Sequence, residues 1–96
     1  MRIDYRPIEQ AAYIRLLDSE VMESEEPESG IVYDFDREDN LVGIELYHLN
    51  KIPAYHLTQI YKYLKTEDEK QEVSKFFDQV LRSKEVTQIA SNSTHD

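Results

Sequence analysis

The stretch that most constrains the fold is residues 30–47, with the sequence GIVYDFDREDNLVGIELY. Apolar side chains recur at every second position in 31–36 and again in 42–47, which is the period of a strand with one buried face. Between these runs lies a polar turn, Arg37-Glu38-Asp39-Asn40. Asn40 is the turn residue best able to adopt the left-handed conformation that a short hairpin loop requires. The sequence therefore predicts a β-hairpin here.

The size and composition of the chain limit its class. A chain of 96 residues, of which 40% are hydrophobic, is enough for one small domain with a modest core. No apolar run approaches the roughly 20 residues of a membrane span, and the N-terminal residues lack the apolar core of a secretory signal. The chain has no cysteine, which excludes a disulfide framework, an iron–sulfur centre and a thiolate zinc site. These features predict a cytoplasmic protein.

The charge of the chain limits its partners. The net charge is −9, and the acidic residues concentrate between positions 18 and 45, where Arg37 is the only base. Such a surface repels polyphosphate and anionic lipid, so the sequence predicts no nucleic acid and no membrane among its ligands. It would attract a basic protein. The alternative is that the acidity only keeps a small protein soluble.

The remaining N-terminal residues predict two further strands, at 2–6 and 11–17, on each side of a proline-containing turn. Residues 18–29 are rich in serine and glutamate and contain Pro27, so they predict a loop. Short connections favour antiparallel neighbours. We therefore expect an α+β fold: a four-stranded antiparallel β-meander in residues 1–50, followed by two C-terminal amphipathic helices.

The period of the apolar residues changes to that of a helix after Asn50. A first helix is predicted over 53–65, and a second begins at the capping box Thr66-Glu67-Asp68-Glu69 and ends near Lys84. The second helix carries an apolar stripe made of Val73, Phe76, Phe77, Val80 and Leu81. This stripe packs either in the core or against a second copy of the chain, and the pattern leaves both open. We expect residues 1–85 to form a single domain and residues 86–96 to be a disordered tail.

Two groups of residues have side chains that could bind a metal ion. Asp34, Asp36, Glu38, Asn40 and Glu45 have the spacing of calcium ligands in an EF-hand, but the flanking residues alternate like strands, whereas an EF-hand needs helices. The histidines His48, His56 and His95 are scattered, with no third ligand suggested. The sequence therefore predicts no metal site, and a site at which His48 and His56 meet stays an alternative.

Signatures of catalysis are lacking in the sequence. The two glycines are far apart, so there is no phosphate-binding loop, and the serines of the acidic segment have no neighbouring histidine. The seven tyrosines suit either packing on the sheet or a binding surface. We expect a non-enzymatic protein with no catalytic residue and no cofactor.

Several motifs in residues 1–47 occur in an order that resembles the YuzE-like family of small bacterial proteins of unknown function. These are the turn at Pro7, the strand Tyr13-Ile14-Arg15-Leu16, the acidic segment Glu23-Ser24-Glu25-Glu26 and the hairpin end Val42-Gly43-Ile44-Glu45. The chain departs from the family at Arg6 and Ile8, and at Asn40, where the family usually has glycine. The resemblance implies the sheet but no established reaction. Family members are similar to partners encoded beside small basic proteins suspected to be toxins, which implies an antitoxin-like role.

The function predicted from these observations is that of a protein–protein interaction module, an antitoxin-like neutraliser of a basic partner. A self-associating structural domain, forming a dimer, is the main alternative, and a small metal-binding protein or enzyme is the other. The acidic segment would steer the partner and the helical stripe would supply buried area. The predicted interface residues are Glu23, Glu25, Glu26, Asp34, Asp36, Phe76, Phe77, Val80 and Leu81.

Overall fold

The computed structural model describes the backbone of residues 1–93 and the side chains of residues 1–80. The chain divides into two compact units, Met1–Tyr63 and Leu64–Asp96. The first contains a sheet and three short helical turns, and the second contains one helix. No helix in the described part of the chain is both long and apolar enough to cross a bilayer.

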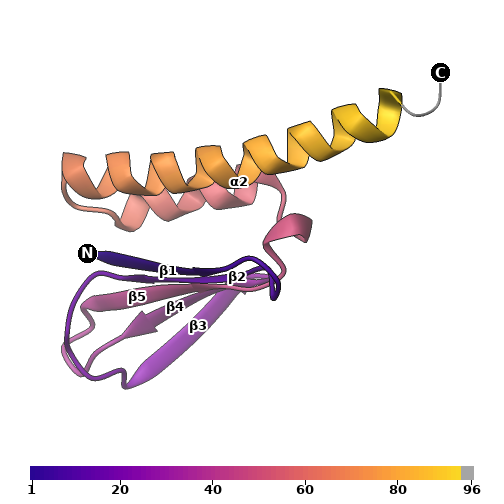
Figure 1. The fold of residues 1–96 in the computed structure, drawn as a ribbon. Coiled ribbons are helices and arrows are strands. Elements are labelled where there is room, and N and C mark those ends of the chain that lie inside the picture. The colour runs from indigo at the N-terminus through magenta and orange to yellow at the C-terminus, as the bar shows by residue number, and fades with distance from the viewer. Residues whose placement is uncertain (94–96) are drawn as a thin grey trace. The chain divides into compact units, whose positions relative to one another are not determined.

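The first unit is built on a five-stranded antiparallel sheet in the order β1-β2-β5-β4-β3 (Figure 1). Its central strand, β5, pairs with β2 on one side and with β4 on the other. The outer strands are β1 and β3. The strands span Arg2–Arg6 (β1), Ala11–Arg15 (β2), Glu23–Glu28 (β3), Ile31–Phe35 (β4) and Leu41–Leu46 (β5).

The predicted α+β class and antiparallel sheet are confirmed, but the four-stranded meander is wrong in strand number and order. The additional strand, β3, forms within the segment expected to be a loop. A strand with the sequence ESEEPE can form because it lies at the edge of the sheet. Its outer side pairs with no other strand, so a proline and charged side chains there interrupt no hydrogen bonds of the sheet. β2 pairs with β5 and not with the next strand along the chain, so the β1–β2 hairpin joins a separate three-stranded meander, β3-β4-β5.

The predicted hairpin is formed by β4 and β5, but its turn differs in detail. The left-handed residue is Asp39, with φ 63°, and not Asn40. Asn40 is held because its backbone N–H donates to the Asp36 carboxylate at 2.9 Å. The same carboxylate oxygen accepts the N–H of Glu38 at 2.9 Å. The side chain of Asp36 thus stabilises the turn by binding the backbone of two later residues. In the turn that results, Asp39 is the residue with positive φ.

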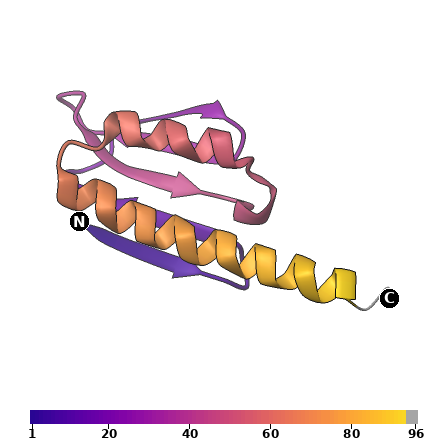
Figure 2. The same cartoon turned by 90° about the horizontal axis from the view of Figure 1, so that it is seen from above.

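Residues 49–63 lie over one face of the sheet (Figures 1 and 2). The predicted helix at 53–65 is an α-helix only in α1, Ala54–Leu57, and continues as the 3-10 helix η2, Thr58–Tyr63. A further 3-10 turn, η1, covers Leu49–Lys51. The sheet and this segment supply the buried apolar residues of the unit, which include Ile14, Ile31, Ile44, Leu46, Leu49, Ile52, Leu57 and Ile60.

The second unit contains the long helix α2, Glu67–Ser93. The predicted capping box is confirmed: the Glu69 N–H donates to Thr66 Oγ1 at 3.1 Å, and the Thr66 N–H donates to Glu69 Oε1 at 3.2 Å. The helix continues beyond Lys84, so the segment expected to be a disordered tail is helical as far as Ser93. Residues 94–96 lie outside the described part.

Candidate functional site

The sheet has a second face, on which polar residues are brought together from four strands. Directly paired residues share a face, and Arg15 pairs with Gly43, which pairs with Asp34, which pairs with Ser24. In the adjacent row Tyr13 pairs with Glu45. The alternation that buries the isoleucines on one face therefore places this polar row on the other.

Tyr13 lies across the backbone of Gly43. A Cβ atom added to Gly43 would meet the Tyr13 ring, 2.9 Å from Cε1 and closer still to its hydroxyl. The ring thereby crosses β5, and its hydroxyl donates a hydrogen bond to Asp34 on β4. The guanidinium of Arg15 lies 5.5 Å from the centre of the Tyr13 ring. Glycine in the middle of β5 is thus explained by the close approach of this ring.

Asp34 and Glu45 form a hydrogen-bonded carboxyl pair, and the Tyr13 hydroxyl is bonded to Asp34. Asp34 is only 2% exposed and accepts a hydrogen bond from Ser24 Oγ at 2.6 Å. Burial raises the pKa of Glu45, and its hydrogen bond with Asp34 and the negative charge of Asp34 raise it further. Ionisation of both carboxyl groups brings two negative charges close together, so Glu45 keeps its proton to a higher pH than an ordinary glutamate.

The tyrosines around the pair remain neutral to high pH. The hydroxyl of Tyr47 donates to Glu45, and this bond raises the pKa of Tyr47 to about 12. Burial, followed by the charge of Asp34, raises the pKa of Tyr13. Within the described residues, every buried side-chain nitrogen or oxygen has a hydrogen-bond partner. The network therefore satisfies its own polar groups and ties β2, β3, β4 and β5 together.

A shallow hollow of about 590 Å³ lies beside this network, towards β1. Its walls carry equal numbers of basic and acidic side chains, and two of the bases are already paired: Arg2 with Asp4 at 3.4 Å and Arg6 with Glu9 at 3.6 Å. The balance leaves no concentrated charge of one sign for a ligand. The charged residues of the hollow are Arg2, Asp4, Arg6, Glu9, Arg15 and Glu45.

Charge of one sign does accumulate at the opposite border of the sheet. Glu23, Glu25 and Glu26 are exposed along β3. Two further carboxylates, Glu20 and Glu38, line a hollow of about 260 Å³ together with the half-exposed side chain of Met22. We call these five glutamates, Glu20, Glu23, Glu25, Glu26 and Glu38, the acidic edge.

The predicted interface residues are only partly brought together. Asp34 and Asp36 are buried and bonded within the sheet and its turn, so they are not part of the exposed acidic edge. Phe76, Phe77 and Val80 are buried side chains of α2, which belongs to the second unit. The side chain of Leu81 lies outside the described part of the chain. Sequence reasoning missed the Tyr13–Asp34 bond, although a glycine inside a strand signals a close approach.

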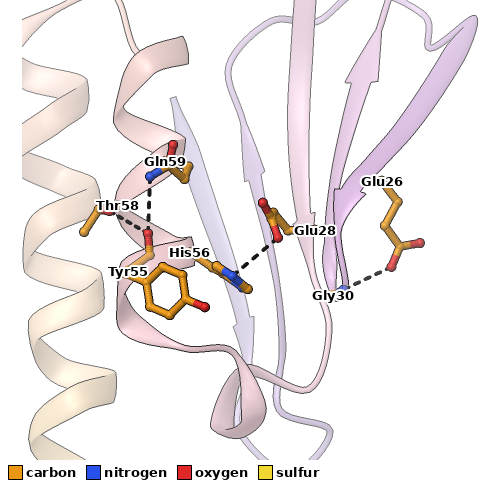
Figure 3. Close-up of polar contacts among 7 residues, drawn as sticks. All are labelled: Glu26, Glu28, Gly30, Tyr55, His56, Thr58 and Gln59. Atoms are coloured by element: carbon orange, nitrogen blue, oxygen red, sulfur yellow. Dashed lines mark hydrogen bonds and ion pairs between the residues drawn. The ribbon is translucent and has the colours of Figure 1, made fainter.

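The histidines do not assemble a metal site in the described residues. His56 lies 3.4 Å from Glu28 and links α1 to β3 (Figure 3), while Glu26 on the same strand accepts the N–H of Gly30 at 3.0 Å. His48 is exposed in a left-handed conformation before η1. Among residues 1–80, no group of three or more histidine, aspartate or glutamate side chains is arranged to hold a metal ion.

Comparison with known proteins gives one match. A protein-family model described as "Protein of unknown function (DUF2283)" matches residues 2–50, which is half of the chain. The matched range contains the five strands of the sheet and the polar network. No curated protein matches this chain, and no solved structure does. The match agrees with the expectation of a small protein from a family of unknown function, and it does not confirm the YuzE-like name.

Proposed function

This chain belongs to the DUF2283 family of proteins of unknown function, and from this premise we propose that it is a non-enzymatic module that binds a basic protein through its acidic edge. The observation that carries the proposal is the exposure of Glu23, Glu25 and Glu26 on an outer strand. Exposed carboxylates that are spread along a strand provide a field that accelerates encounter with a cationic surface.

The small hollow at the acidic edge adds a place for contact. Glu20, Glu38 and Met22 line it together with one base, Arg37, so acidic side chains outnumber basic ones there. A lysine or arginine side chain has an apolar stem and a charged head, so it can pack on methionine while its charge meets a carboxylate. This combination favours a basic partner over a purely apolar one.

The polar network supports a structural reading over an enzymatic one. Asp34 accepts hydrogen bonds from Tyr13 and Ser24, and Glu45 is hydrogen-bonded to both Asp34 and Tyr47. A general acid needs a reacting group within hydrogen-bond reach. Here the hydrogen-bond partners of both carboxyl groups are side chains of the sheet itself. The raised pKa of Glu45 therefore follows from strand packing, which is a common cause of such shifts.

The antitoxin-like role implied by the YuzE-like resemblance is the narrower form of this proposal, since a small basic toxin is one partner that would fit. A cytoplasmic location, and the lack of nucleic-acid and membrane ligands, stay predictions from composition. Self-association through Phe76, Phe77, Val80 and Leu81 also stays a prediction.

The test is affinity capture with two matched variants. Glu23→Gln/Glu25→Gln removes two charges from the acidic edge, and Glu9→Gln/Glu72→Gln removes two exposed charges elsewhere. We expect the wild type and the control to retain the same basic protein at low salt and to release it at high salt, because exposed charges are screened. The edge variant should lose it. Equal retention by the edge and control variants would contradict the proposal.

A further inference from the structure

The two outer strands of the sheet differ in how well they resist pairing with another strand. β3 carries three of the devices that block edge-to-edge association: a proline at Pro27, a register shift between Glu25 and Glu28, and a run of like charges. A second acidic strand would be repelled there. β3 is therefore protected against extension of the sheet by another copy.

β1 lacks these devices. Its register with β2 runs unbroken from Arg2 to Arg6, and the strand contains no proline. It forms the other outer border of the sheet, at its indigo end in Figure 2. Arg2, Asp4 and Arg6 alternate in sign on the polar face, and Ile3 lies on the other face. A regular edge with alternating charges is suited to pairing with a strand of complementary sequence.

We propose that a second copy of this chain pairs with the outer edge of β1, antiparallel and about a two-fold axis at Ile3. The two sheets then form one continuous antiparallel sheet. β1 of each copy lies at the interface, because a two-fold interface uses the same surface of both subunits. Residues that are directly opposite each other must point to the same face of the sheet, whereas adjacent residues of one strand point to opposite faces. The two-fold axis therefore passes through a residue of β1 and not between two residues. Charge decides which residue this is.

An axis at Ile3 places Arg2 opposite Asp4 of the second copy, twice, and Ile3 opposite Ile3. Four charges then alternate on the polar face, and the ion pair between Arg2 and Asp4 inside one chain, at 3.4 Å, becomes part of that group. An axis at Asp4 would instead oppose Asp4 to Asp4 and Arg2 to Arg6. Like charges directly opposite destabilise a sheet, so this register is rejected.

An axis at Tyr5 also opposes unlike charges, Asp4 to Arg6, but it brings Pro7 against Ile3. Pro7 has no N–H to donate, and it already opens the turn to β2, in which the N–H of Gln10 donates to the Pro7 carbonyl at 3.2 Å. That pairing would therefore run into the turn at both of its ends. The axis at Ile3 does not involve the turn.

The experiment is a charge swap, read by sedimentation equilibrium of the full chain. Arg2→Asp and Asp4→Arg each replace two attractive cross-strand pairs by two repulsive ones, so each variant alone should weaken dimerisation by about tenfold or more. Mixing the two variants restores attraction at both pairs and should restore dimers. The double variant Arg2→Asp/Asp4→Arg should dimerise like the wild type. Glu25→Arg on β3 is the control and should leave the dimer unchanged.

Three results would overturn the inference. The first is a wild type that stays monomeric at millimolar concentration. The second is a dimer that Arg2→Asp and Asp4→Arg both leave intact, which would place the interface elsewhere, including on the helical stripe. The third is failure of the mixed variants to associate although each keeps the circular dichroism spectrum of the wild type. If one single variant loses that spectrum, the other single variant decides, because it must still weaken the dimer.

Discussion

The ring of Tyr13 crosses the backbone of Gly43, so a side chain on β2 reaches a buried carboxylate on β4 over the strand between them. Gly43→Ala should therefore destabilise the fold by about 1–3 kcal/mol, because the new methyl group displaces the ring and breaks its bond to Asp34. Urea unfolding at constant pH measures this loss.

A double-mutant cycle separates the clash from other effects of the alanine. In the background Tyr13→Ala the ring is absent, so Gly43→Ala should cost much less there than in the wild type. The same cost in both backgrounds would mean that Gly43 is needed for another reason. Gly30→Ala is not a matched control, because Gly30 has φ 88° and its substitution is strained by the backbone itself.

The parts of the fold that depend on local pattern could be read from the sequence. The hairpin of β4 and β5 follows from alternation, and the start of α2 follows from Thr66 and Glu69. β3 could not be read in this way, because its sequence has little strand propensity and its pairing with β4 provides the ordering. Context outside the segment decided its structure.

The same distinction explains which site features were foreseen. The concentration of acidic residues is visible in the sequence, but exposure separates Glu23 and Glu25 from Asp34. Asp34 follows the tyrosine of an alternating strand, and the Tyr13 hydroxyl to which it is hydrogen-bonded comes from a strand that is distant in sequence. The ion pair between Glu28 and His56 was not foreseen because it needs β3.

Replacing Thr66 should weaken the start of α2. Its hydroxyl oxygen accepts the N–H of Glu69, so Thr66→Ala should cost about 1 kcal/mol and Thr66→Ser much less, since serine keeps the acceptor. Thermal unfolding followed by circular dichroism compares the two variants. Equal losses would show that the methyl group, and not the cap, carries the effect.

Asp36 should make the protein sensitive to acid. Hydrogen bonds from the backbone N–H groups of Asn40 and Glu38 hold the pKa of Asp36 below its ordinary value of 3.8. A lowered pKa in the fold means that the stabilisation is present above that ordinary value and is lost as the pH falls through the folded one. Asp36→Asn keeps an acceptor but cannot titrate, so its stability should fall less steeply in acid than that of the wild type.

Asp36→Ala removes the acceptor altogether and should be less stable than Asp36→Asn at neutral pH. The turn then has two backbone N–H groups without their partner, because the carboxylate serves Glu38 and Asn40 at once. Unfolding free energies of the three proteins between about pH 2 and about pH 7 make the comparison. Parallel curves for the wild type and Asp36→Asn would contradict the assignment.

Glu45 should act in the opposite direction. Burial and the neighbouring Asp34 raise the pKa of Glu45 above its ordinary value of 4.5, so the folded protein binds this proton more tightly than the unfolded chain. Its stabilising contribution is complete below that ordinary value and is lost as the pH rises through the raised one. Glu45→Gln resembles the protonated form and can still donate to Asp34 and accept from Tyr47.

Relative to the wild type, the Glu45→Gln variant should therefore gain stability as the pH rises from about 4 to about 7. Urea unfolding across this range checks the sign, with Glu72→Gln on α2 as the exposed control. A constant difference between Glu45→Gln and the wild type would show that Asp34 and Glu45 do not share a proton.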